Sequence, residues 1–218
     1  MAAACAAASS AETLKNIHDA LCCRIVYTDD ETTDEDDCAT GALLTGEANC
    51  DGYADALYLV GSLAGLEVRY QHGDSVKQGL GNLFATHMWN MVSLDGTWRL
   101  VDTTWDDRED VDPLYAWFNI GEDRAAKTHV WSREMTVAMD PVTDIAARVE
   151  PEYAVTDRED VAWAVRDAVS RGLNIICLYV SDDSIMDETE VHFAVRDSMD
   201  GSYSYMWLDG LNAMRIQR

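Results

Sequence analysis

The stretch HMWNMVSLDGTWRLVD, residues 87–102, decides the expected fold because it predicts a β-hairpin. Two strand-like runs flank Asp95-Gly96, and this dipeptide favours a two-residue type I′ turn. Apolar residues lie on both faces of the predicted hairpin. We therefore expect the hairpin to lie inside a sheet that is covered on both sides.

The register of this hairpin brings a histidine and an aspartate to one face. Pairing the residues next to the turn places His87 opposite Thr104. Asp102 points to the same side as Thr104, so it is a diagonal neighbour of His87, about 7–8 Å away at the backbone. Long side chains can bridge that distance, and a carboxylate so placed can orient an imidazole.

Cys50 is the candidate nucleophile for this pair. The loop GEAN, residues 46–49, precedes it, and the apolar spacing of residues 50–64 predicts a helix that begins at the cysteine and ends before Gly65. The positive end of a helix dipole favours the thiolate form, which is the reactive form of cysteine. Gly52 is expected to leave space beside the sulfur for an acyl group. Any one of these residues alone is usually structural, so the hypothesis depends on their combination.

The other cysteines and histidines suggest neither a disulfide framework nor a metal site. Cysteines occur irregularly and without a CxxC pair, and the histidines show no HExxH spacing, so we predict no metal and no cofactor. The acidic loop at 28–37 lacks the glycine and terminal glutamate of an EF-hand, which favours a solvated loop. Four histidines lack a partner in the sequence pattern and are interpreted as structural: His18, His72, His129 and His192.

Charge and hydropathy exclude several classes of partner. The formal net charge of −24 disfavours nucleic acid and anionic membrane, although the same acidity can serve solubility alone. No apolar run has the length of a membrane span, and the alanine-rich start lacks the positive region of a secretory signal. We therefore expect no membrane insertion, and the compartment and oligomeric state stay open.

Pattern reading predicts helices at 12–27 and 157–171 and a strand at 66–70 that is followed by a glycine-rich loop through Gly73, Gly79 and Gly81. A strand at 173–180 and a final hairpin at 202–208 and 213–217 complete the regular elements. The segment 113–131 is read as irregular, and 187–197 fits either a helix or a strand.

Three motifs resemble bacterial transglutaminase-like proteins: CDGYADA at 50–56, HMWN at 87–90 and VDTTWDD at 101–107. They occur in the order Cys, His, Asp. The segments IHD at 17–19, FNI at 118–120 and HVW at 129–131 are similar to that family as well, so the resemblance covers roughly 12–135.

This resemblance implies an α+β, papain-like fold in which the nucleophile helix packs on an antiparallel sheet. It implies Cys50 as nucleophile, His87 as base and Asp102 as the residue that orients the imidazole, with the Cys50 N–H as an oxyanion donor. Two departures from the family pattern stand beside the sulfur. Asn49 replaces a small or aliphatic residue, and the Asp51 carboxylate opposes thiolate formation.

The expected domains are a flexible tail at 1–10, a transglutaminase-like catalytic domain at 11–140, a linker at 141–152 and a small α/β module at 153–218. The expected function is thiol-dependent acyl transfer on peptide or protein amides, with hydrolysis favoured over cross-linking. A catalytically silent binding or scaffold module is the alternative. A third interpretation places the function in 152–218 as a partner-binding domain.

Overall fold

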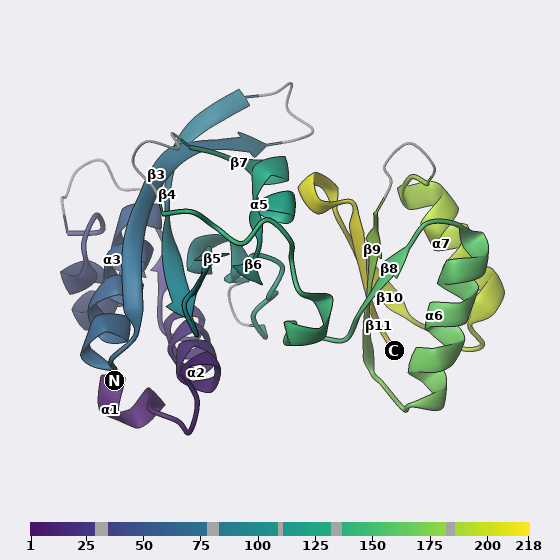
Figure 1. The fold of residues 1–218 in the computed structure, drawn as a ribbon, viewed down its shortest axis with the longest axis horizontal. Coiled ribbons are helices and arrows are strands. Elements are labelled where there is room, and N and C mark those ends of the chain that lie inside the picture. The colour runs from purple at the N-terminus through teal and green to yellow at the C-terminus, as the bar shows by residue number, and fades with distance from the viewer. Residues whose placement is uncertain (29–34, 78–82, 109–110, 132–136, 182–185) are drawn as a thin grey trace. The chain divides into compact units, whose positions relative to one another are not determined.

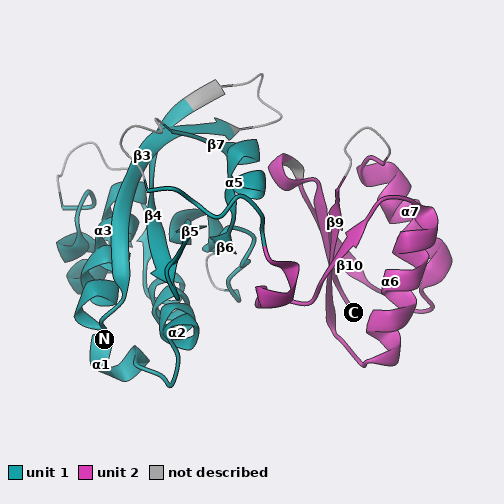
Figure 2. Cartoon of the chain, viewed as in Figure 1, with its two compact units in different colours: residues 1–77, 83–143 teal, residues 78–82, 144–218 magenta. Residues whose placement is uncertain are grey.

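The computed structural model describes residues 1–28, 35–77, 83–108, 111–131, 137–181 and 186–218. The chain forms two compact units, and each has its own sheet. Figure 2 shows the first unit, which comprises Met1–Lys77 and Leu83–Thr143, and the second, which contains Asp144–Arg218. The division falls inside the predicted linker at 141–152. Within the described residues, no helix is both long enough and apolar enough to cross a membrane.

The first unit is built on an antiparallel sheet in the order β6-β5-β4-β3-β7 (Figure 1). The helix α3 contacts the two longest strands of this sheet, β3 and β4, and α2 packs against α3. This arrangement confirms the α+β class with a helix on an antiparallel sheet. The strands are β3 (Glu67–Lys77), β4 (Leu83–Leu94), β5 (Thr97–Val101), β6 (Phe118–Ile120) and β7 (His129–Val130). The helices are α1 (Ala2–Cys5), α2 (Ser10–Cys22), α3 (Cys50–Leu63), α4 (Thr103–Asp106) and α5 (Glu122–Thr128).

The central hairpin has the register that the sequence predicts. Leu94 pairs with Thr97 across the turn, and both turn residues, Asp95 and Gly96, have positive φ angles of 53° and 81°. Positive φ at both central positions is the requirement of a type I′ turn. Strand β5 ends at Val101, however, so Thr104 lies in α4 and does not pair with a strand.

Three local predictions differ from the structure. Residues 2–5 form the short helix α1 with a buried Cys5, where a flexible tail was expected. Gly73 lies inside strand β3, not in a loop, while Gly79 and Gly81 fall outside the described residues. The segment 113–131 contains β6, α5 and β7, because short elements that pair at sheet edges carry little periodic signal.

The second unit is a four-stranded sheet in the order β10-β11-β9-β8, with β8 and β9 parallel and the other pairs antiparallel. Helices α6 and α7 pack against each other beside this sheet (Figure 1). Their apolar faces and the inner strand residues form the core of the unit. The ambiguous segment 187–197 is helical. The elements are β8 (Glu152–Val155), α6 (Arg158–Ser170), β9 (Ile175–Val180), α7 (Glu188–Ser198), β10 (Ser204–Leu208) and β11 (Ala213–Gln217).

Candidate active site

Cys50 is the first residue of α3, as the sequence predicts, and Asn49 caps the helix. The side-chain oxygen of Asn49 accepts hydrogen bonds from the backbone N–H groups of Asp51 and Gly52 at 3.0 and 3.3 Å. Its backbone oxygen accepts from the N–H of Tyr53 at 3.0 Å. Asparagine is among the preferred N-cap residues, so this departure from the family pattern stabilises the helix start.

The Cys50 side chain lies on the wall of a pocket with a volume of about 370 Å³. Its Sγ atom lies 3.8 Å from the Asp51 carboxylate. Gly52, which was expected to leave space for an acyl group, is not among the residues that line this pocket; a Cβ there would lie 2.3 Å from the backbone oxygen of Asp36, so this glycine serves close packing. The pocket residues are Tyr27, Cys50, Ser75, Ala85, Thr86, His87, Thr104 and Trp105.

His87 and Asp102 form a buried hydrogen-bonded pair. The distance between His87 Nε2 and Asp102 Oδ2 is 2.7 Å, and the exposed fractions of the two side chains are 6% and 0%. Asp102 follows the end of β5 and is the N-cap of α4, where its Oδ1 accepts the backbone N–H of Trp105 at 3.1 Å. The carboxylate is thereby fixed by its own helix start, and this leaves the other oxygen for the imidazole.

The charge of Asp102 dominates the electrostatics of His87. Burial alone would lower the pKa of His87, but the Asp102 carboxylate and hydrogen bonds with Asp102 and Cys50 raise this pKa to about 10. Burial alone would raise the pKa of Asp102, but the His87 charge and hydrogen bonds from His129 and His87 lower it well below its usual range. The pair therefore exists as imidazolium and carboxylate at neutral pH, and an imidazolium stabilises a neighbouring thiolate.

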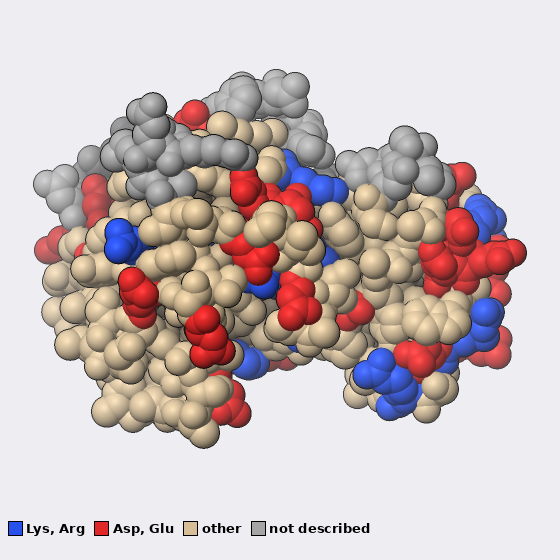
Figure 3. All heavy atoms as spheres, viewed as in Figure 1, with Lys and Arg blue, Asp and Glu red and all other residues tan. Residues whose placement is uncertain are grey.

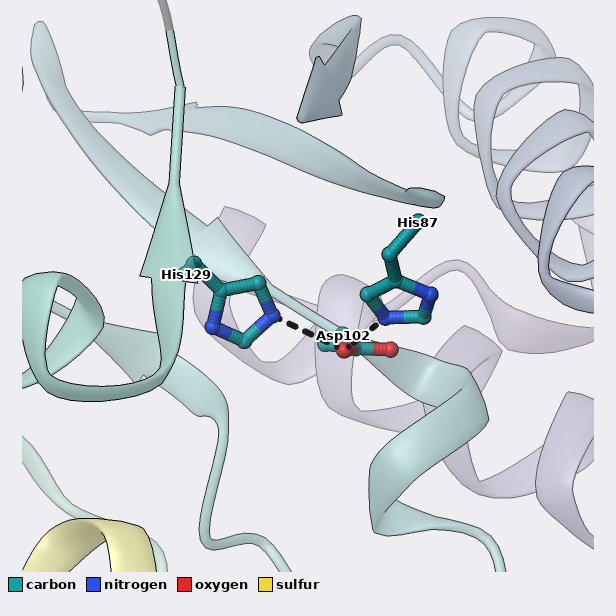
Figure 4. A group of neighbouring side chains, drawn as sticks. All are labelled: His87, Asp102 and His129. Atoms are coloured by element: carbon teal, nitrogen blue, oxygen red, sulfur yellow. Dashed lines mark hydrogen bonds and ion pairs between the residues drawn. The ribbon is translucent and has the colours of Figure 1, made fainter. Parts of the chain in front are cut away.

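The interpretation of His129 as an unpartnered structural residue was wrong. Its Nε2 atom lies 3.1 Å from the same Asp102 oxygen that His87 contacts, so the two imidazoles lie on either side of one carboxylate (Figure 4). The sequence pattern did not predict this contact, because His129 lies on the edge strand β7 and no local signal specifies how that strand pairs. The HVW motif at 129–131 was the only signal that pointed to it.

Three side chains of the site also have the spacing of possible metal ligands. Potential ligand atoms of His87, Asp102 and His129 all lie within 4.8 Å of one another. Their separations of 2.7 and 3.1 Å from Asp102 Oδ2 are ordinary hydrogen-bond lengths. Protons alone therefore account for this geometry, and a cation would have to displace them.

His18 also has carboxylate partners, contrary to expectation, but it does not line the pocket of Cys50. Its Nε2 lies 3.3 Å from Asp106 at the end of α4, and its Nδ1 lies 3.2 Å from Asp19. Burial alone would lower the pKa of His18, but hydrogen bonds with Asp106 and Asp19 raise it well above its usual value. The neighbouring Cys22 is buried and its thiol pKa is raised, mainly by burial, so this cluster is structural.

Two tryptophans of the sequence motifs have different surroundings. Trp89 is 1% exposed and belongs to the core on one side of the sheet. Trp105 lines the pocket and stacks on the His87 ring, with the ring centroids 5.1 Å apart. Trp105 therefore contacts the candidate base directly.

A cysteine at a helix start, facing a histidine that a buried carboxylate holds on the adjacent sheet, defines the papain-like class of thiol sites. Residues 2–103 match the model of the transglutaminase-like superfamily. This part of the chain, which contains Cys50, His87 and Asp102, belongs to that superfamily. Membership supports thiol-dependent acyl transfer as the general class of chemistry.

Comparison with known proteins gives further matches. The chain is 41% identical over 71 residues to kyphoscoliosis peptidase from Homo sapiens and 39% identical over 71 residues to that from Mus musculus. Each match covers 30% of this chain and 11% of the relative, so the chain spans about a tenth of those proteins.

Two solved structures are also similar. One is provisionally described as a cysteine protease from Cytophaga hutchinsonii, with 17% identity and a TM-score of 0.37 over 42% of this chain and 30% of that one. The other is described as a TGase, with 14% identity and a TM-score of 0.40 over 51% of this chain and 31% of that one.

Proposed function

We propose that this chain catalyses acyl transfer on peptide or protein amides through an acyl-Cys50 intermediate, with water as the usual acceptor. The observation that carries the proposal is that Cys50 and His87 line one pocket while Asp102 holds the far side of the imidazole. Because His87 Nε2 is engaged by Asp102, its Nδ1 is the atom left to exchange a proton with the sulfur.

The proposed reaction has two steps. The Cys50 thiolate attacks the amide carbon, and the His87 imidazolium gives its proton to the amine as the C–N bond breaks. Water then gives a proton to His87 and attacks the thioester, which releases the acid and restores Cys50. An amine in place of water would give cross-linking.

The backbone N–H of Cys50 is the proposed oxyanion donor. The next three N–H groups of α3, those of Asp51, Gly52 and Tyr53, all donate to Asn49. Among the described residues, no acceptor is recorded for the Cys50 N–H. This group is therefore available to a developing negative charge next to the sulfur.

The proposed substrate is a neutral or basic peptide segment. Acidic side chains outnumber basic ones by 40 to 16, and Figure 3 shows Asp and Glu side chains on both units with fewer Lys and Arg among them. Such a surface repels acidic chains and attracts basic ones.

One observation favours a second candidate, a binding module that keeps the fold without turnover. The Asp51 carboxylate lies 3.8 Å from Cys50 Sγ, and a negative charge at that distance opposes thiolate formation.

Alkylation with iodoacetamide separates the two candidates. The exposed Cys23 serves as an internal comparator, and peptide mass spectrometry reports each cysteine separately. If the proposal is right, Cys50 reacts at least tenfold faster than Cys23 at pH 6.5, and His87→Ala abolishes the preference. Equal, slow alkylation of all six cysteines would support the silent module. A peptide-library screen for hydrolysis and amine incorporation, with Cys50→Ser as the blank, then identifies the acceptor.

A further inference from the structure

We infer that His129 is a positioning residue for the site, and that Thr128 and Trp117 fix its protonation so that it donates to Asp102. The inference rests on the proposed function, because it assigns a task within the same site. It starts from a continuous chain of four hydrogen bonds that links Trp117, Thr128, His129, Asp102 and His87.

The donor-to-acceptor direction along this hydrogen-bond chain follows from the chemistry of the groups at its two ends. The indole Nε1–H of Trp117 can only donate, and it donates to Thr128 Oγ1 at 3.1 Å. An ionised carboxylate can only accept, so His129 Nε2 carries a proton and donates to Asp102 at 3.1 Å. Between them, Thr128 Oγ1 and His129 Nδ1 lie 2.9 Å apart.

The tautomer of His129 is then determined. Burial lowers the pKa of His129 despite the opposing effect of Asp102, so the ring is neutral. A neutral ring protonated at Nε2 has a lone pair at Nδ1, and the Thr128 hydroxyl donates its proton to that lone pair. Thr128 thus accepts from Trp117 and donates to His129, and both ring nitrogens of His129 have a hydrogen-bond partner.

This hydrogen-bond chain immobilises the Asp102 carboxylate. Oδ1 accepts from the backbone of Trp105, and Oδ2 accepts from both His129 and His87. Rotation of the carboxylate would break three hydrogen bonds in a fully buried place. His129 therefore holds Asp102 Oδ2 where it keeps His87 Nε2 protonated and turns Nδ1 toward Cys50.

The backbone around His129 allows strand β7 to pack closely on β3, so that the His129 side chain reaches Asp102. Strand β7 pairs with β3 so that His129 faces Ser75, and Gly73 in β3 lies opposite His87. A Cβ on Gly73 would lie 2.2 Å from the backbone oxygen of Val130. A glycine is thus required for β7 to come close enough for His129 to reach Asp102.

Two matched pairs of variants test the inference in the full chain. His129→Gln keeps an N–H donor near the Nε2 position, whereas His129→Met has similar volume and no donor. Thr128→Ser keeps the hydroxyl, whereas Thr128→Val keeps only the shape. The first readout is NMR of ¹⁵N-labelled histidine, which reports the His129 tautomer and the His87 Nε2 proton without reference to activity. The second readout is the rate of Cys50 alkylation.

We expect neutral His129 protonated at Nε2 from pH 6 to 8. His129→Met should lose the sharp His87 Nε2 proton signal and slow Cys50 alkylation about tenfold or more, while His129→Gln restores both to within about threefold. Thr128→Val should act in the same direction and Thr128→Ser should not. A His129 ring protonated at Nδ1, or equal behaviour of the Gln and Met variants, overturns the inference. A wild-type Cys50 that is no more reactive than Cys23 overturns the proposed function instead, and the NMR result still decides the role of His129.

Discussion

Replacement of Asp102 by asparagine tests the electrostatic basis of the site, because the amide keeps the shape of the carboxylate and removes its charge. In the native protein, one carboxylate oxygen accepts from two imidazoles and the other accepts from the Trp105 backbone. An asparagine has only one acceptor oxygen. If this oxygen faces the imidazoles, the NH₂ group faces the Trp105 N–H, and one partly buried donor is unsatisfied.

Two magnitudes follow from Asp102→Asn. The unsatisfied donor lowers the free energy of unfolding by about 1–3 kcal/mol. Loss of the charge returns the pKa of His87 from about 10 toward its ordinary value of 6.5, which corresponds to roughly 5 kcal/mol in the free energy of the imidazolium. At pH 7.5 the imidazolium fraction then falls from nearly all molecules to about a tenth at most.

The assay is the pH profile of Cys50 alkylation, measured against Cys23 in the same molecules. We expect Asp102→Asn to react at least tenfold more slowly at pH 7.5, with the rise in its alkylation rate displaced to higher pH than in the native protein, because an imidazolium no longer stabilises the thiolate. Denaturant unfolding monitors stability separately. An unchanged rate and pH profile in a folded Asp102→Asn protein would refute the reasoning, because the carboxylate would then have no influence on the imidazole.

The raised pKa of His87 also predicts a pH dependence of stability, because the protonated ring stabilises the folded state fully below about pH 6.5 and loses this effect as pH rises through about 10. Over that range the free energy of unfolding of the native protein should fall by up to roughly 5 kcal/mol relative to that of His87→Gln. The same pH dependence of stability in both proteins would contradict this. Gly73→Ala should destabilise the first unit by roughly 1–3 kcal/mol and slow Cys50 alkylation, because the new methyl group would clash with backbone atoms. The control is Gly65→Ala, where a methyl group enters open space and only the strain of a φ angle of 86° remains. It should lower the free energy of unfolding by about 1 kcal/mol and leave Cys50 alkylation unchanged. Arg215→Met leaves the half-buried Glu150 without its bidentate partner and should destabilise the second unit by about 3 kcal/mol. The double variant Arg215→Met, Glu150→Gln should recover part of that stability, because it removes the unpaired charge. No recovery would show that the two residues are not coupled.

The part of the site that shares one hairpin was predictable from the sequence. The type I′ turn fixes the register, and the register brings His87 and Asp102 to one face. Cys50 at the start of α3 followed from the apolar spacing of residues 50–64 and from Gly65 just after the helix, which are local signals. These features depend on interactions between residues that are close in the chain.

The contact of His129 with Asp102 was not predictable in this way. It depends on the pairing of a two-residue edge strand with β3, and no local pattern specifies such a pairing. Gly73 was misread for a related reason: glycine signals a loop, but here it relieves crowding between three strands. The capping role of Asn49 was not among the predictions, although an asparagine directly before a helix is a local signal for it.

The four-residue helix α4 has an aspartate at each end, Asp102 as its N-cap and Asp106 as its last residue, and each aspartate contacts a histidine. Asp102 contacts His87 in the site, and Asp106 contacts His18 of α2 and accepts the backbone N–H of Trp117 at 2.9 Å. Selection on activity should therefore extend beyond the pocket. In relatives we expect positions 18 and 106 to change together, since a lone buried charge at either one would shift the helix that begins directly after Asp102.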